Sequence, residues 1–158
     1  MKRILLALML IASPALAAGP DNENTADPAT VEPTYDVLAV YKVKIDYGKP
    51  EDAVAELQEI LKKHPGNPDV LSILGYGSRK LERWDASRSY YEQALAADPV
   101  HRDALEYMAE LELQVGDVEA ARALMVRLKE ACPKGCSELK LLEKAFKKAG
   151  VSAEGGES

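Results

Sequence analysis

The sequence has few residues of the kinds from which metal centres and nucleic-acid-binding surfaces are built. Among its 158 residues are two Cys, two His, one Trp and one Phe. So small a set of Cys and His leaves little material for a metal cage. Acidic residues outnumber basic ones by 26 to 20, whereas a nucleic-acid binder needs a cationic surface to displace counterions. We therefore expect no nucleic-acid partner, no metal and no other cofactor.

Catalytic motifs are equally scarce. The chain has no G-x-S-x-G elbow, no phosphate-binding glycine-rich loop and no H-E-x-x-H helix. His64 and His101 fall in predicted turns, and neither has a neighbouring motif that would position a partner for proton transfer. The sequence thus predicts a protein that is not an enzyme and has no catalytic residue.

Residues 1–17 have the pattern of an export signal. Lys2 and Arg3 form a basic head, residues 4–12 are an apolar run, and small residues precede a cleavage point at Ala17. The apolar run is too short to cross a bilayer, which takes about 20 residues. We therefore predict cleavage near Ala17, a periplasmic location and no stable membrane insertion after cleavage.

The segments on either side of the main domain are polar. Residues 18–33 are rich in Pro and acidic residues and have almost no apolar side chain, so burial cannot offset the entropy lost on ordering. Residues 150–158 contain Gly-Gly and two Glu, which is typical of a frayed end. The sequence predicts a signal peptide at 1–17, a disordered leader at 18–33, a folded domain at 34–149 and a disordered tail at 150–158.

A period of 34 residues organises the domain. Pro65, Pro99 and Pro133 are spaced by 34 residues. Aligning the chain on these prolines brings apolar residues into columns, among them Val37, Leu71, Leu105 and Leu139, and also Val40, Leu74, Met108 and Leu142. A repeat of this length indicates stacked supersecondary units, because a single unit is too thin to bury its own apolar faces.

Each unit contains two helical patterns. In the second unit, Leu71, Leu74 and Gly75 lie on one helix face, and a further amphipathic pattern runs from Trp84 to Leu95. We interpret Trp84 and the neighbouring tyrosines as core residues rather than ligand-stacking ones. The sequence predicts an all-α fold with seven helices, at 34–46, 50–63, 68–81, 85–97, 102–114, 118–131 and 136–148.

The second unit resembles the tetratricopeptide repeat. The residues that carry the resemblance are Leu71, Leu74, Gly75, Ser87, Tyr91, Ala94 and Pro99. The resemblance extends from Thr34 to about Lys148 and implies a right-handed α-solenoid of three helix-turn-helix repeats followed by a C-terminal capping helix. Tyr41 departs from the family pattern, because it fills a column that Gly75 and Ala109 keep small. We therefore expect the first repeat to pack loosely or to tilt.

In this family the first helix of each repeat lines a concave groove where peptides or partner proteins often bind. The resemblance implies a candidate peptide groove formed by Tyr35, Leu38, Lys42, Tyr76, Arg79, Lys80, Glu106 and Glu110. Tyr76 and Leu38 would be apolar anchors, and Arg79 and Lys80 would contact an acidic neighbour. Two alternatives stay open: Tyr35, Leu38 and Tyr76 pack partly against neighbouring helices, and Arg79 and Lys80 are ordinary surface charges.

Some family members clamp the terminal carboxylate of a peptide with Lys and Asn at set columns. In this chain those columns hold Leu38, Lys42, Ile73, Glu106 and Glu110. The clamp is not reproduced, which disfavours the binding of a chaperone tail.

Cys132 and Cys136 join the last repeat to the capping helix. Two cysteines in an exported protein usually pair, and Pro133 and Gly135 between them allow a tight turn. The C-x3-C spacing is not that of the thioredoxin-type redox motif. We predict a structural disulfide, with free thiols and redox or metal chemistry as the alternatives.

These features favour a scaffold or adaptor that binds a protein or peptide segment in its groove without catalysis. An alternative from another class is a thiol- or metal-handling accessory protein that acts through Cys132 and Cys136. A third possibility is self-association by end-to-end stacking, with no foreign ligand.

Overall fold

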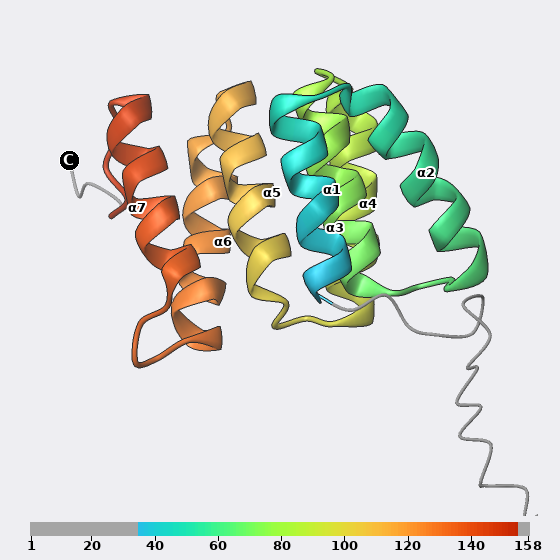
Figure 1. Ribbon diagram of the computed structural model, residues 1–158. Coiled ribbons are helices and arrows are strands. Elements are labelled where there is room, and N and C mark those ends of the chain that lie inside the picture. The colour runs from blue at the N-terminus through green and yellow to red at the C-terminus, as the bar shows by residue number, and fades with distance from the viewer. Residues whose placement is uncertain (1–34, 155–158) are drawn as a thin grey trace, which may run out of the picture.

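The computed structural model describes residues 35–154, which form seven helices and no strand (Figure 1). In chain order the helices are α1 (Tyr35–Tyr47), α2 (Pro50–Lys63), α3 (Pro68–Lys80), α4 (Trp84–Ala97), α5 (Arg102–Val115), α6 (Val118–Ala131) and α7 (Ser137–Ala149). Each boundary lies within one residue of the predicted position, so the all-α solenoid is confirmed. The signal peptide and leader predicted at 1–17 and 18–33 lie outside the described residues.

Turn residues set where the helices begin and end. Pro68 starts α3, where its missing N–H is not needed, and the side chain of Asn67 caps the same helix by accepting a hydrogen bond from Val70. Asp117 caps α6 in the same way. Gly116 ends α5 in the left-handed conformation that glycine adopts without strain. None of the helices formed by residues 35–154 is long and apolar enough to cross a membrane.

The helices form two layers (Figure 1). The inner layer contains α1, α3, α5 and α7, in which each helix contacts the next, and α2, α4 and α6 form the outer layer. The pairs α3 with α4 and α5 with α6 make the most extensive contacts. They are the hairpins of the second and third repeats, and α7 closes the stack by packing mainly on α5.

The apolar core runs along the whole stack. Leu74 and Tyr91 belong to a cluster built from the first four helices and α5, and Leu105 and Phe146 belong to a second cluster towards α7. All four side chains are almost completely buried, and full burial of such a side chain stabilises the fold by about 1.5–3 kcal/mol. Tyr90 packs against both clusters, which makes the core continuous, as stacked repeats require.

The C-terminal end of the stack is covered. Leu142 and Phe146 of α7 point into the core, whereas the lysines of this helix are exposed. Residues 150–154, which the sequence analysis assigned to the tail, still contact the domain. Val151 and Ala153 pack against the second cluster, and the Nε atom of Arg122 donates a hydrogen bond to the carbonyl of Ser152 at 3.1 Å.

The first repeat departs from the regular arrangement. Val37 and Val40 share columns with Leu71 and Leu74, but they are 48% and 63% exposed while the two leucines are buried. The contact between α1 and α2 is far smaller than the contacts within the other two hairpins, and α2 packs mainly on α3. Figure 1 shows α1 lying over α3 rather than beside α2. The expectation of a loosely packed or tilted first repeat is confirmed.

Gly75 allows α3 and α4 to approach closely. A Cβ atom at Gly75 would lie 2.4 Å from the Tyr91 ring, and the Ser87 hydroxyl donates a hydrogen bond to the Gly75 carbonyl at 2.8 Å. In α1 the equivalent residue is Tyr41, which places a ring where α3 has no side chain. This difference accounts for the weaker pairing of α1 with α2.

We expect Gly75→Ala to lower the free energy of unfolding by about 1–3 kcal/mol, the usual cost of overpacking a filled core. The loss would occur although alanine favours a helix over glycine by about 1 kcal/mol. Urea denaturation followed by circular dichroism measures the change. The matched control is Ala109→Gly, the reverse substitution in the same column, which should cost about 1 kcal/mol through helix propensity. An unchanged or higher stability of Gly75→Ala would contradict the close approach.

Candidate functional site

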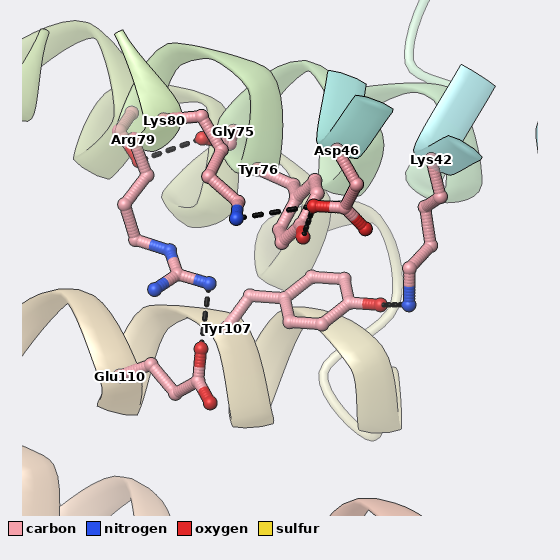
Figure 2. A network of polar contacts seen from close by, with 9 residues as sticks. Lys42, Asp46, Gly75, Tyr76, Arg79, Lys80, Tyr107 and Glu110 are labelled. Carbon is pink, nitrogen blue, oxygen red and sulfur yellow. Dashed lines mark hydrogen bonds and ion pairs between the residues drawn. The ribbon is translucent and has the colours of Figure 1, made fainter. Parts of the chain in front are cut away.

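Side chains from three inner helices meet at the predicted groove. Figure 2 shows Lys42 and Asp46 of α1, Tyr76 and the charged residues of α3, and Tyr107 and Glu110 of α5 pointing toward one another. Hydrogen bonds and ion pairs join them into three groups, and cation–π contacts with the Tyr76 ring connect these groups. The groove is therefore covered by α1 at this end of the stack.

Asp46 links α1 to α3. Its carboxylate accepts a hydrogen bond from the Tyr76 hydroxyl and lies 3.0 Å from the Lys80 ammonium. Burial opposes ionisation of Asp46, but the Tyr76 hydrogen bond and the Lys80 charge outweigh it and lower the pKa of this carboxyl. Burial and the neighbouring Asp46 raise the pKa of Tyr76. At neutral pH the pair therefore consists of a carboxylate and a hydroxyl donor.

Lys42 connects the first repeat to the third. Its ammonium lies 5.6 Å from the centroid of the Tyr76 ring and 4.9 Å from that of Tyr107, and it donates a hydrogen bond to the Tyr107 hydroxyl. The two rings are 5.1 Å apart and tilted. Cation–π contacts of this kind contribute about 0.5–2 kcal/mol each. They hold α1 over the middle repeat, within reach of α5.

Charged groups are buried beneath this contact. Arg79 is only 6% exposed, and its Nη2 atom donates a hydrogen bond to Glu110 at 2.6 Å. Glu106 is 2% exposed and shares a side-chain hydrogen bond with Glu110. Burial and the adjacent Glu110 carboxylate raise the pKa of Glu106 far above its ordinary value. Glu106 is therefore protonated at neutral pH, and Glu110 is the partner of Arg79 in the ion pair.

The predicted groove residues differ in how exposed their side chains are. Leu38, Tyr76, Arg79 and Glu106 are buried, so the alternative in which apolar members pack against neighbouring helices describes Leu38 and Tyr76. The remaining members are Lys42 and Glu110, which are half-buried, and Lys80, which is exposed. The side chain of Tyr35 lies outside the described part of the structure.

Sequence reasoning missed Asp46 and Tyr107. Asp46 shares a column with Lys80, and this opposite charge within one column was the available signal. Tyr107 had no such signal, because a regular period places the first and third repeats too far apart to meet. The reach of Lys42 to Tyr107 follows from the displacement of α1.

A hollow of about 430 Å³ stays open beyond the part that α1 covers, between α3, α5 and α7. Its lining residues come from the C-terminal halves of these helices: Tyr76, Arg79, Lys80, Glu110, Leu113, Gln114, Ala145, Lys148 and Ala149. Lys80 and Lys148 are exposed at the hollow, and Leu113 and Ala145 are partly buried in it. A protein segment that carries an acidic and a small apolar side chain suits this lining.

A second hollow, of about 380 Å³, lies at the opposite ends of the same helices. It contains Asp69, Asp103 and Glu138 together with His101, whose ring nitrogen is 3.0 Å from Asp69. Burial raises the pKa of the Asp103 carboxyl. Carboxyl groups outnumber Arg102 in this hollow, so the inner face is acidic where α3, α5 and α7 begin, and exposed lysines lie where α3 and α7 end. Among residues 35–154 no three His, Cys, Asp or Glu side chains are grouped so that they could hold a metal ion.

Cys132 and Cys136 form the predicted disulfide, with their Cα atoms 5.9 Å apart. Cys132 ends α6 and Cys136 precedes α7. Cys132 is buried in the second core cluster and Cys136 packs against it, so the bridge fastens the capping helix to the third repeat. Closing so short a loop stabilises the fold by about 2 kcal/mol. The packed position of the pair gives the thiol- or metal-handling alternative no support.

The fold defines a helical-repeat protein, and comparison with known proteins specifies the repeat. Residues 78–135 match the family model described as tetratricopeptide repeat. The human protein "Tetratricopeptide repeat protein 7B" is 31% identical over 88 residues, which are 56% of this chain and 10% of that protein. The chain thus spans about a tenth of the length of this relative. The chain is therefore similar to tetratricopeptide repeat proteins, in agreement with the resemblance seen in the sequence.

Two solved structures share the fold. "Crystal structure of MamA" is similar with a TM-score of 0.59 and 20% identity, over 80% of this chain and 72% of that one. "First TPR of Spaghetti (RPAP3) bound to HSP90 peptide SRMEEVD" is similar with a TM-score of 0.59 and 17% identity, over 73% of this chain and 92% of that one. At these identities the likeness extends to the fold alone.

Glu106 should make stability fall as pH rises. In the folded chain it keeps its proton above the ordinary glutamate pKa of about 4.3, whereas in the unfolded chain it loses that proton. The folded state binds more protons in this window, so the free energy of unfolding decreases with increasing pH. We expect Glu106→Gln to raise it by on the order of 1 kcal/mol at about pH 8 and to have little effect near pH 4. Urea titrations at both pH values measure the difference.

The control for this measurement is Glu143→Gln, which changes an exposed carboxyl on α7. It should leave the pH dependence as in the wild type. A Glu106→Gln chain that is no more stable than the wild type at alkaline pH would show that Glu106 is ionised at little cost.

The disulfide leads to a separate expectation. Protein isolated from its native compartment, denatured and left unreduced, should contain no free thiol by a thiol-specific reagent. The double variant Cys132→Ser/Cys136→Ser should lose about 2 kcal/mol of stability, because the unfolded chain is no longer restricted. Reduction of the wild type should give the same loss. Two free thiols in the unreduced protein would contradict the bridge.

Proposed function

We propose that this chain is an exported, non-catalytic scaffold that binds an acidic segment of a partner protein on the inner face of its repeat stack. The observation that carries the proposal is the open hollow between α3, α5 and α7. It lies on the face that the tetratricopeptide repeat fold presents as its concave side, and stacked repeats create extended binding surfaces there.

The charges of the hollow support an acidic ligand. Lys80 and Lys148 are exposed at its rim, while Arg79 lies in its floor and is paired with Glu110. An acidic side chain that enters would meet the two ammonium groups before it reaches the ion pair. Exposed charges of this kind steer the encounter and select the partner more than they raise affinity.

The nature of the segment follows from what the groove lacks. One domain with the same fold is bound to the HSP90 peptide SRMEEVD, which supports peptide binding on this architecture. In this chain the columns used for a terminal-carboxylate clamp in some family members include Leu38, Glu106 and Glu110. The first two are buried, and the third pairs with Arg79. The proposal therefore assigns an internal acidic segment rather than a chain terminus.

Export is the further part of this proposal. It is supported by the basic head and apolar run of residues 1–17. It is also supported by the bridge between Cys132 and Cys136, because disulfides persist in oxidising compartments such as the periplasm.

The proposal is tested by cross-linking from the hollow. A photo-activated amino acid at Gln114, which lines the hollow, should capture a partner protein in cells. The same group at Glu92, exposed on the outer helix α4, serves as the control and should not capture it. Reversing the rim charges with Lys80→Glu/Lys148→Glu should reduce the capture severalfold, because like charges would then face the acidic segment.

The matched charge control is Lys63→Glu/Lys129→Glu, which reverses two exposed lysines of the outer helices that do not line the hollow. It should leave the capture unchanged. Equal capture from Gln114 and Glu92, or equal loss with both pairs of reversals, would refute the hollow as the binding surface.

A further inference from the structure

The helix α1 has two apolar faces, and only one of them is buried. Leu38 and Ile45 are buried, at 2% and 4% exposure. On the other side of the helix, Val37, Val40 and Val43 are 48%, 63% and 59% exposed. An ordinary surface helix has a single apolar stripe. A helix with two such stripes can be buried in either of two positions.

The buried face of α1 is the face that a regular first repeat would turn toward the groove. Leu38, Lys42 and Ile45 occupy the columns that hold Ser72, Tyr76 and Arg79 in α3, so a regular first repeat would turn them toward the open groove. Instead they lie against the inner helices. Leu38 and Lys42 line a small pocket with residues of α3 and the start of α5, Ile45 lies beside Gly77, and Lys42 meets Tyr107. Thus α1 occupies the groove as a ligand helix would.

The exposed face of α1 is the face that a regular first repeat would bury against α2. Val37 shares a column with Leu71 and Leu105, which are buried within their own hairpins. The same register opposes Tyr41 to Leu57, where the second repeat opposes Gly75 to Tyr91. Tyr41 is larger than Gly75 and Leu57 is smaller than Tyr91, so the Tyr41 ring would enter part of the space that Tyr91 fills in the second hairpin. A move of α1 toward α2 would bury the valines and free the groove.

We propose that α1 is a displaceable occupant of the groove between α3 and α5, and that the external partner is an amphipathic helix with the pattern of α1's buried face. That pattern is an apolar residue, a cation four residues later, an apolar residue seven later and a carboxylate eight later, as in Leu38, Lys42, Ile45 and Asp46. In the groove the Tyr76 and Tyr107 rings contact the cation of this pattern, and Tyr76 and Lys80 bind its carboxylate.

The proposed partner helix and the acidic segment of the proposed function belong to one ligand, so this inference rests on the proposed function. Asp46 sits beside Lys80, and Lys80 also lines the open hollow. A partner helix that takes the place of α1 would therefore direct the chain that follows it into that hollow. The acidic segment would begin at the carboxylate that replaces Asp46.

The test uses the full chain and a fluorescent peptide with the sequence of residues 34–49. The variant Leu38→Asp/Ile45→Asp removes both apolar contacts of α1 in the groove and should release it. Because the covered state competes with the peptide, the released variant should bind it at least about tenfold more tightly than the wild type in fluorescence anisotropy. A peptide with the same two substitutions should not bind.

The matched control is Val37→Asp/Val40→Asp, the same change on the exposed face of the same helix. It leaves α1 in the groove and should bind the peptide no more tightly than the wild type. If the released variant loses helicity by circular dichroism, Lys42→Glu replaces it, because this change removes the cation that the Tyr76 and Tyr107 rings contact and places a carboxyl near Asp103.

Equal affinity of the wild type and the released variant, with cross-linking from Gln114 intact, would overturn this inference and leave the proposed function standing. Loss of that cross-linking with tight peptide binding by the released variant would overturn the proposed function instead. The peptide is a piece of the chain itself, so a second copy is the competing occupant. If the wild type is a dimer and the released variant is a monomer, the groove binds α1 of a second copy. That result would overturn the proposal of an external partner.

Discussion

A helical hairpin can bury one of its faces only by packing against another hairpin, and the structure follows from how the two ends of the stack meet this constraint. At the C-terminal end α7 supplies a helix that is apolar on one side and rich in lysine on the other. At the N-terminal end Val40 and Val43 stay exposed and α1 leans over the inner face. The two ends are therefore not equivalent. One is closed, and the other has a helix that packs on the inner face of the stack.

Burying polar groups beneath α1 costs free energy. Arg79 and Glu106 are buried, and the carboxyl of Glu106 must keep its proton to remain there. Apolar residues of similar size would often give equal or greater stability at such positions. A buried polar network does, however, allow only arrangements that satisfy its partners, and it penalises others. Beside these buried groups, α1 contributes Lys42 to the Tyr107 hydroxyl and Asp46 to Tyr76 and Lys80.

Local signals predicted the helices, because each boundary is set by residues that act on their own neighbours. Backbone geometry and capping start or end a helix at Pro68, Asn67 and Gly116, and these signals can be recognised in the sequence. The columns of the repeat likewise predicted the core of the second and third hairpins, where Leu74 and Leu105 are buried.

The same columns misled the reading of the groove, because a period treats all repeats as equal. Arg79 and Glu106 are groove residues by register, yet both are buried. The helix α1 also leaves its place in the period, because it packs more on α3 than on α2. Only the substitution of Tyr41 for a small residue indicated this departure, and it gave no direction for the shift. The contact between Lys42 and Tyr107 joins repeats that regular spacing keeps apart, so the local pattern could not contain it.

The charges of the inner face give a bound helix a direction. The first half of α1 lies near Asp69 and Asp103, and its last turn lies near Lys80. A helix carries partial positive charge at its N-terminus and partial negative charge at its C-terminus, and each favourable side-chain charge there contributes about 0.3–1 kcal/mol. The acidic and basic ends of the groove thus favour a helix that runs parallel to α1. They disfavour the reversed one, which would turn its positive end toward the lysines. In α3 and α7 an acidic residue in the first turn and basic residues in the last turn stabilise the helix by the same effect. The charges that support the fold would therefore also set the direction of the proposed partner helix.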